Sequence, residues 1–322
     1  MKHADIIQTL DLEQKCALLS GGTVFDTRAL PGKGIPSITL SDGPNGVRKQ
    51  AGAADHLGLN PSVPATCFPP SATVAHRWDP ALGEASGEAM GEEAAAQEVS
   101  VLLGPGLNIK RSPLCGRNFE YFSEDPYLAG KMAAGYVRGI QKNGIAACPK
   151  HFAVNSQELR RMASDSIVDE RTLRELYRTG WEIVVTAAKP KTIMSSYNLV
   201  NGTYANENAH LLQDILRRDW GFDGAVVTDW GGSNDHALGV KNGSTLEMPF
   251  PGDDSVRELM KAVGSGKISE HDVDARLDEL LELVLDTKAA VEKAPRTFDA
   301  AAHHALARRA AAQSIVLLRN EG

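Results

Sequence analysis

Short apolar runs alternate with longer helical patterns along most of this chain, and this alternation limits the folds it can adopt. A strand followed by a helix, repeated, builds a parallel sheet with helical crossovers. We predict strands at residues 37–40, 72–75, 101–109, 146–152, 192–197, 225–228 and 245–248, and helices at 80–98, 126–143, 170–188, 207–220 and 271–291.

The number of these units favours a barrel. Seven of them within about 290 residues fit a (β/α)8 fold better than a doubly wound sheet, since typical barrels take ~250 residues. We therefore expect an α/β protein with a (β/α)8, TIM-type barrel over residues 1–294, whose first strands need not be regular.

Residues 295–322 follow a different pattern. Pro295 and Arg296 end a charged stretch, a helix is predicted over 300–312, and the apolar run 314–320 is typical of a strand. That strand has no predicted partner in this chain. We expect a linker helix and the first strand of a second α/β domain that is mostly absent from this sequence.

The predicted helix 80–98 has an unusual face. Gly83, Gly87 and Gly91 recur at four-residue spacing, while Glu84 and Glu88 lie between them. The spacing would suit helix dimerisation in a membrane, but the glutamates argue against a membrane. We expect this glycine face to pack closely against the sheet.

Composition excludes several classes of partner. The 322 residues are 42% hydrophobic, enough for a large core, and the net charge of −7 argues against a nucleic-acid surface. Neither a secretory leader after Met1 nor an apolar run of membrane-spanning length is visible in the sequence. We expect a soluble, cytoplasmic protein with no membrane partner.

Metal and cofactor motifs are missing from the sequence. The four cysteines form no Cys-x-x-Cys pair, the nine histidines form no His-Glu-x-x-His motif, and no glycine-rich phosphate loop is present. Acyl transfer lacks a Gly-x-Ser-x-Gly motif. We expect neither a metal nor a cofactor.

The segment Ala225-Val226-Val227-Thr228-Asp229-Trp230-Gly231-Gly232 is the most informative stretch for function. It has the length and valine content of a buried strand and then ends in a carboxylate, an indole and two glycines. An acid there lies at the carboxyl end of a strand, where parallel α/β folds bind ligands. The alternative is that Asp229 caps the following helix.

Polar clusters also follow other predicted strands. Each has a structural alternative: Asp42 and Arg117 could form an ion pair, Lys150 could be a solvated charge, and Tyr197 could belong to the core. Together they favour function, because the carboxyl ends of barrel strands form the active-site face. The clusters are 41–48, 111–120, 150–161 and 195–198, besides the one at Asp229.

Such a set of side chains suits the recognition of a polyol. A carboxylate accepts hydrogen bonds from vicinal hydroxyls, Arg and Lys donate to others, and an aromatic ring covers sugar C–H groups. Phosphate binding would need more cations and a glycine-lined helix start. The clusters therefore indicate a sugar site.

Five of the motifs together resemble the catalytic barrel of family 3 glycoside hydrolases, most like the β-glucosidases. The resemblance runs from about residue 10 to the end of the chain. The motifs are Ser41-Asp42-Gly43-Pro44, Gly116-Arg117-Asn118-Phe119-Glu120, Lys150-His151-Phe152, Ser196-Tyr197-Asn198 and Val227-Thr228-Asp229-Trp230.

This resemblance implies a retaining exo-hydrolase that releases terminal β-D-glucose from β-glucosides or short oligosaccharides. Asp229 is then the catalytic nucleophile. The residues implied to hold the terminal sugar are Asp42, Arg117, Lys150, His151 and Tyr197, with Trp230 beside it and Arg161 as a further candidate.

The second carboxyl group of a retaining enzyme, the acid/base, is not visible in this chain. Many similar family members carry it in a following domain, and residues 315–322 resemble the start of that domain. The single-domain β-N-acetylglucosaminidases use a His in a Pro-Gly-His-Gly continuation after Lys-His-Phe, where this chain has Ala153-Val154-Asn155-Ser156.

We therefore expect a truncated two-domain β-glucosidase whose acid/base comes from the missing C-terminal domain or from a complementary chain. A β-xylosidase or a β-N-acetylglucosaminidase of the same family, and a non-catalytic sugar-binding barrel, are the alternatives.

Overall fold

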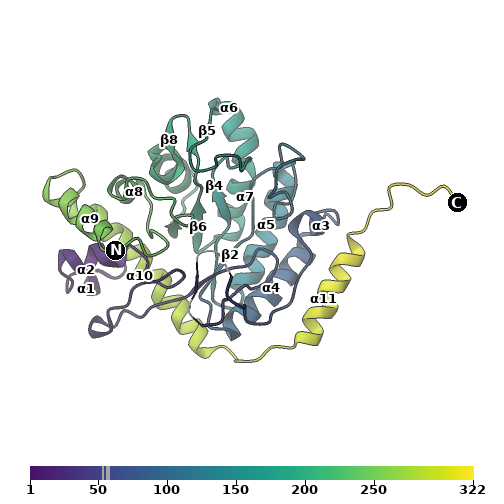
Figure 1. Ribbon diagram of the computed structural model, residues 1–322, viewed down its shortest axis with the longest axis horizontal. Coiled ribbons are helices and arrows are strands. Elements are labelled where there is room, and N and C mark those ends of the chain that lie inside the picture. Colours follow the sequence, from purple (N-terminus) through teal and green to yellow (C-terminus); the bar gives the residue numbers. More distant parts are fainter. Residues whose placement is uncertain (53, 56–58) are drawn as a thin grey trace.

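The computed structural model describes residues 1–52, 54–55 and 59–322 and shows an α/β protein built on short parallel strands (Figure 1). One sheet has the order β1-β2-β3 and another the order β4-β6-β9, and all pairs in both are parallel. The strands are β1 (Leu40–Asp42), β2 (Val101–Leu103), β3 (Ala146–Ala147), β4 (Lys150–Phe152), β6 (Thr192–Ser195) and β9 (Ala225–Val227).

Isolated bridges extend this strand order at both ends of the second sheet. Lys150 of β4 pairs with Gly106, Val227 of β9 pairs with Leu246, and Glu247 pairs with Ser20. The pairings among the described residues confirm the α/β class, but they do not amount to a closed eight-stranded barrel. A third, small sheet joins β5 (Asp165–Ser166), β7 (Leu199–Val200) and β8 (Thr203–Tyr204) outside this arrangement.

The strands are buried on both faces, as parallel sheets require. Val101 and Leu103 belong to one apolar cluster, while Leu102 between them belongs to another. The same alternation separates Val227 from Val226 in β9. The cluster of Leu102 and Val226 continues into an outer layer of helices, whereas the cluster of Leu103 and Val227 includes Leu18, Leu277 and Leu281 from other helices.

Helices α4 (Pro80–Ala96), α5 (Pro126–Gln141) and α7 (Thr179–Ala188) form that outer layer on one side (Figure 1). Two of them begin with the same signal. The Asp79 side chain accepts hydrogen bonds from the first turn of α4, whose N1 residue is Pro80, and Asp125 with Pro126 does the same for α5. Both starts were predicted at these residues.

The glycine face of α4 packs closely, as expected, but its partner is α5 and not the sheet. A Cβ atom at Gly87 would lie 2.5 Å from the carbonyl oxygen of Tyr136, and one at Gly91 would lie 2.6 Å from that of Ile140. On the other helix, a Cβ at Gly139 would lie 2.1 Å from the carbonyl oxygen of Glu84. Glycine on both sides lets the two backbones touch.

The remaining helices complete the outer layer, and α1, α2, α8, α9 and α10 lie together at one end of the molecule (Figure 1). In the part of the chain that the structure describes, no helix has both the length and the apolar content to cross a membrane. These elements are α1 (Ala4–Ile7), α2 (Leu12–Leu18), η1 (Pro31–Lys33), α3 (Ser71–Ala75), α6 (Glu170–Thr172), η2 (Leu173–Tyr177), η3 (Ala205–Glu207), η4 (His210–Asp219), α8 (His236–Asn242), α9 (Asp254–Gly264) and α10 (Glu270–Lys293).

Several predicted elements need correction. Residues 72–75 lie within helix α3 and do not form a strand, because the short run Ala-Thr-Val-Ala has no diagnostic period. The strand predicted over 101–109 ends at Leu103, before Pro105, which lacks an N–H for the ladder. The helix predicted over 170–188 is divided into α6, the π-helical η2 and α7.

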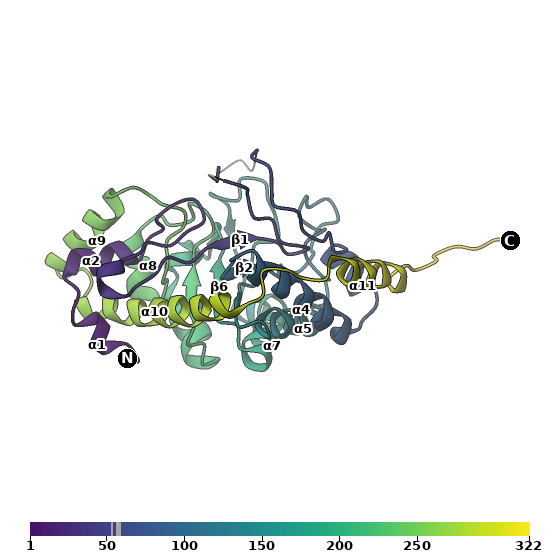
Figure 2. The same ribbon diagram turned by 90° about the horizontal axis from the view of Figure 1, so that it is seen from below.

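The end of the chain leaves the body of the molecule. Helix α11 (Ala300–Gln313) packs against α3 and α4, where His303 lies 2.8 Å from Glu93 and 3.2 Å from Glu92. Residues 315–322 then extend away from all other elements (Figure 2), and Ile315 to Leu318 are exposed. The division into a barrel over 1–294 and the start of a second domain over 295–322 stays a prediction.

Candidate active site

Asp229 lies two residues after the end of β9, in the loop that leads to α8, and it is only 9% exposed. The backbone N–H of Trp230 donates to Oδ1 at 2.8 Å. No described side chain or backbone group donates to Oδ2, although that atom is buried. Asp229 does not cap α8: the N-cap is Asp235, which accepts a hydrogen bond from the backbone N–H of Leu238 at 2.9 Å.

Lys150 and Asp42 meet across the strands β4 and β1. The Lys150 Nζ lies 3.3 Å from Asp42 Oδ1, and the lysine is 5% exposed, so it is not a solvated surface charge. Burial lowers the pKa of Lys150, but the charges of Asp42, Glu120 and Asp229 outweigh burial and raise it overall. Lys150 is therefore a buried cation.

His151, the next residue, is held by two side chains from the loop before α5. Arg117 Nη2 lies 2.9 Å from His151 Nε2, and the Tyr121 hydroxyl lies 3.0 Å from Nδ1. His151 Nε2 is also 3.6 Å from Asp229 Oδ2. Burial, followed by the nearby cations Arg117, Lys150 and Arg161, lowers the pKa of His151 well below its usual value, so the ring is neutral.

Glu158 connects the two arginines of the site. Its carboxylate accepts from Arg161 Nη1 at 3.0 Å and lies 3.5 Å from Arg117 Nη1. The Arg161 guanidinium stacks over the Tyr197 ring at 4.7 Å. Tyr197 is buried, and its hydroxyl donates to the Trp230 carbonyl oxygen at 2.7 Å. This network reaches the backbone of Trp230, the residue that follows Asp229.

Trp230 is fixed from its other side. Its indole N–H donates to the Val24 carbonyl oxygen at 2.7 Å, and its ring lies 5.4 Å from the Phe25 ring. The indole is therefore tied to the segment before β1.

A hollow of 590 Å³ opens beside these side chains and is large enough for a sugar residue. Asp42, Arg117 and Lys150 lie on its wall, whereas Asp229 is linked to the wall through His151 and Arg117. The other described lining residues are Gly43, Pro44, Asn45, Gly46, Val47, Arg48, Ser62, Val63, Ala65, Thr66, Cys67, Phe119 and Glu120.

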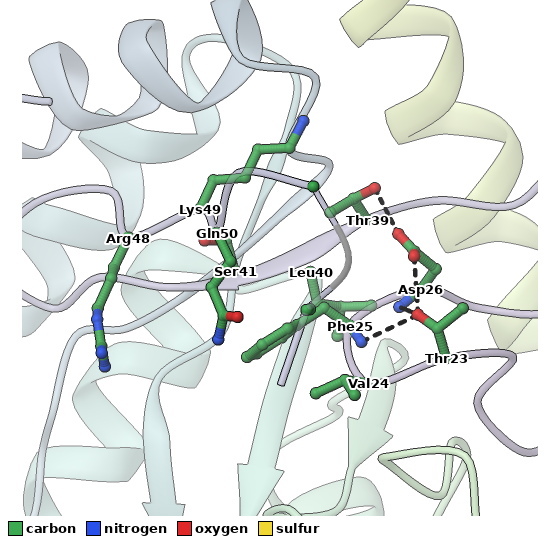
Figure 3. A pocket seen from close by; sticks show the side chains of 12 residues that line it. Thr23, Val24, Phe25, Asp26, Thr39, Leu40, Ser41, Arg48, Lys49 and Gln50 are labelled. Atoms are coloured by element: carbon green, nitrogen blue, oxygen red, sulfur yellow. Dashed lines mark hydrogen bonds between the residues drawn. The ribbon is translucent and has the colours of Figure 1, made fainter. Parts of the chain in front are cut away.

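A second hollow of 270 Å³ lies beside β1, and Arg48 lines both (Figure 3). Asp26, the acid among the described residues of its wall, accepts hydrogen bonds from the hydroxyls of Thr23 at 2.8 Å and Thr39 at 2.7 Å (Figure 3). Because both carboxylate oxygens of Asp26 already have partners, this hollow offers less acid chemistry than the one at Lys150.

The charge around Asp229 is finely balanced. Burial raises the pKa of Asp229, and the cations Lys150, Arg117 and Arg161 lower it without cancelling the effect of burial. Burial thus disfavours the ionised form of this carboxylate, and the three nearby positive charges favour it. Such a perturbed acid beside a hollow is typical of functional sites.

The structure brings together every residue that the sequence singled out, through contacts that were not predicted. Asp42 pairs with Lys150, while Arg117 pairs with Glu120 and Glu158, so the suggested Asp42–Arg117 ion pair is not formed among the described residues. Glu120, Tyr121 and Glu158 were missed as site residues. Glu120 could have been found from its position three residues after Arg117, but Tyr121 carries no comparable signal.

No group of three or more His, Cys, Asp or Glu side chains is arranged to hold a metal ion in residues 1–52, 54–55 and 59–322. The chemistry available at the site is that of a carboxylate, cations and hydroxyl groups.

Comparison with known proteins agrees with this chemistry. Residues 53–283 match the glycosyl hydrolase family 3 N-terminal domain. The chain is 49% identical to thermostable beta-glucosidase B of Acetivibrio thermocellus over 98% of its own length and 42% of that protein. It is 45% identical to an exo-alpha-(1->6)-L-arabinopyranosidase of Bifidobacterium longum, again over 98% of the chain and 42% of the relative.

Solved structures show the same likeness. Beta-glucosidase 3B of Thermotoga neapolitana, solved in complex with glucose, is 38% identical and superimposes with a TM-score of 0.93 over 100% of this chain and 48% of that one. The chain thus spans less than half the length of these relatives. With a family match over most of its residues and relatives this similar, the chain belongs to glycosyl hydrolase family 3.

Proposed function

We propose that this chain is the sugar-binding, nucleophile-bearing part of a retaining exo-β-glucosidase. The observation that carries the proposal is Asp229: a buried carboxylate at a strand end with one oxygen unpartnered by the described protein groups, close to three cations. The names of the relatives and the glucose bound to the solved structure support glucose as the terminal sugar.

In the proposed first step, Asp229 Oδ2 forms a bond to the anomeric carbon. The bond between that carbon and the leaving oxygen breaks, and the oxygen keeps the electron pair and takes a proton from an acid. Retaining enzymes place that acid on a second carboxyl group about 5 to 5.5 Å from the nucleophile. We propose that a following domain or a complementary chain supplies it, since this chain covers 42% of its β-glucosidase relative.

The other residues of the site bind the sugar in this proposal. Asp42 accepts hydrogen bonds from sugar hydroxyls, while Lys150 and Arg117 donate to them from the wall of the same hollow. His151, Tyr197 and Arg161 complete the set, with Trp230 beside the sugar. A (β/α)8 barrel, larger than the pairings described above, would carry all of these at one rim.

Pentopyranosides are the second candidate substrates. The arabinopyranosidase relative acts by its name on a sugar without a C6 hydroxymethyl group, as β-xylosides also lack one. Its 45% identity covers the same residues as that of the β-glucosidase. The hollow therefore has to be tested with both kinds of sugar.

The test uses a donor that needs no acid. With 2-deoxy-2-fluoro-β-D-glucosyl fluoride, the carbon–fluorine bond breaks and fluoride leaves with its electron pair, so the chain should gain one fluoroglucosyl group. Intact-mass spectrometry and peptide mapping should place it on Asp229. A folded chain that gains no adduct, or gains it elsewhere, would refute the proposal. Faster labelling by the corresponding xylosyl fluoride would favour pentopyranosides.

A further inference from the structure

Tyr121 is a buried phenol with a partner inside the candidate site. It is 1% exposed, and its hydroxyl lies 3.0 Å from His151 Nδ1. The backbone at Gly106 holds the ring in place, because a Cβ there would lie 3.0 Å from the Tyr121 ring. The phenol therefore cannot move far from the imidazole.

The other ring nitrogen of His151 faces a group that can only donate. Arg117 Nη2 lies 2.9 Å from Nε2, and a guanidinium has no acceptor. Nε2 must then carry the lone pair, and the single proton of the neutral ring lies on Nδ1. It follows that Nδ1–H donates to the Tyr121 oxygen.

The opposite tautomer would change the surroundings of Asp229. With the proton on Nε2, the ring would direct an N–H toward Asp229 Oδ2, which is 3.6 Å away and has no donor among the described groups. Tyr121 could serve that tautomer too, by donating its O–H to Nδ1. Arg117 would lose its contact with Nε2 but keep Glu120 and Glu158.

We infer that Tyr121, acting with Arg117, is a positioning residue that holds His151 as the Nδ1–H tautomer and so keeps Asp229 Oδ2 free of a hydrogen bond. The role of Oδ2 as the attacking atom rests on the proposed function. The assignment of the His151 tautomer does not depend on that function. A ring N–H bonded to Oδ2 would stabilise the resting carboxylate and would be weakened as the bond to carbon forms. The free oxygen is the better nucleophile.

Tyr121→Phe removes the acceptor for Nδ1–H without changing the shape of the ring. A buried, unpaired N–H is costly, and the alternative tautomer gains a charge-assisted hydrogen bond to Asp229. The variant should therefore shift His151 toward the Nε2–H form. Tyr136→Phe is the matched control: Tyr136 is also 1% exposed, and its hydroxyl makes no hydrogen bond to His151 in the described chain.

The first measurement reports the tautomer directly. The 322-residue chain is labelled with ring-¹⁵N histidine, and the His151 pair is assigned as the signals missing from His151→Gln. The nitrogen without a proton resonates well downfield of the one that carries it. We expect Nδ1–H in the wild type and in Tyr136→Phe, and Nε2–H in Tyr121→Phe. An Nε2–H ring in the wild type, or an unchanged ring in a folded Tyr121→Phe, would overturn the inference.

The second measurement is the rate of labelling by the fluoroglucosyl fluoride across pH. Tyr121→Phe should label about tenfold more slowly, from the loss implied by one hydrogen bond to a charged group, and its acid limb should move to lower pH. Tyr136→Phe should match the wild type. Labelling of Tyr121→Phe at the wild-type rate, after its tautomer has changed, would refute the link to Asp229. A wild type that never labels but shows Nδ1–H would refute the proposed function and leave the tautomer assignment intact.

Discussion

Two largely buried carboxylates, whose side chains are each 12% exposed, lie at opposite ends of strand β9, and their surroundings differ. At the carboxyl end, Asp229 Oδ1 accepts from the Trp230 N–H, and no described group donates to Oδ2. At the amino end, Glu279 of α10 is bonded through both oxygens. Its donors are Arg217 at 2.8 and 2.9 Å, Arg276 at 2.8 Å and the Thr245 hydroxyl at 2.7 Å.

The directions of their pKa shifts do not distinguish Asp229 from Glu279. Burial raises the pKa of both Asp229 and Glu279, and nearby cations oppose it in both cases. The difference lies in the hydrogen bonds: both oxygens of Glu279 accept hydrogen bonds, whereas Oδ2 of Asp229 accepts none from the described groups. We expect the saturated carboxylate to stabilise the amino end of β9, and we propose a chemical role only for the unsaturated one.

Replacing the two carboxylates by their amides separates the roles, and the largest effect is expected at Asp229. Asp229→Asn should slow labelling by the fluoroglucosyl fluoride by more than about 10³-fold, because the attacking oxygen is lost. Its free energy of unfolding should stay equal to that of the wild type or rise, since a buried and poorly paired charge is removed. Labelling kinetics and urea unfolding measure the two quantities. Wild-type labelling in Asp229→Asn would contradict this comparison.

Glu279→Gln is the matched change at the other end of β9. It should lower the free energy of unfolding by about 3 kcal/mol, because two buried arginines lose their counter-charge. The folded fraction should still be labelled at the wild-type rate. Urea unfolding followed by tryptophan fluorescence gives the stability. Loss of labelling without loss of stability would show that the two clusters are not functionally distinct.

The pH dependence follows from the raised pKa of Asp229. Labelling needs the ionised form, so the rate should fall about tenfold per pH unit below the folded-state pKa, which lies above the usual value of ~3.9. A group with a raised folded-state pKa binds its proton more tightly in the fold. Stability from this group is therefore present below the unfolded-state pKa and is lost as the pH rises through the folded-state pKa.

Asp229→Asn tests that sign. The free energy of unfolding of Asp229→Asn should increase relative to that of the wild type as the pH rises from ~4 to ~7. Unfolding curves at several pH values measure this difference. A constant difference over this range would mean that the fold does not penalise the Asp229 charge.

The smallest effect is expected at Thr245, whose hydroxyl donates to Glu279 and accepts from the Val226 N–H at 3.0 Å. Thr245→Val should cost about 1 to 2 kcal/mol in the free energy of unfolding, with no change in labelling rate. Thermal unfolding monitored by circular dichroism is sufficient. A labelling defect here would connect the amino end of β9 to the site.

Local signals in the sequence were enough for the starts of helices α4 and α5. Asp79 with Pro80, and Asp125 with Pro126, place an acceptor and a fixed φ angle at the helix start, so α4 and α5 begin where predicted. The strand predicted at 72–75 was wrong because a run of only four residues suits a helical turn as well as a strand. The prediction that Gly87 packs against the sheet was also wrong. Small residues indicate that another segment approaches closely, but they do not identify that segment.

The sequence singled out residues that gather around Asp229, but it did not predict which of them contact one another. Polar residues at strand ends were expected to meet; Lys150 contacts Asp42, and its charge acts on Asp229. Their pairing was not predictable, because Arg117 could reach several carboxylates from its loop. Glu158 and Tyr121 were missed since each acts on another side chain, at a distance that only the folded loops define.

The order of residues along the chain determined which elements form and which side chains follow the strands, because caps, apolar periods and turns are short-range properties. The tertiary structure alone decided which of these side chains touch, which nitrogen of His151 carries its proton, and which oxygen of Asp229 stays free. Those depend on distances of about 3 Å between segments far apart in sequence, and hydrogen bonds are lost within a few tenths of an ångström beyond that.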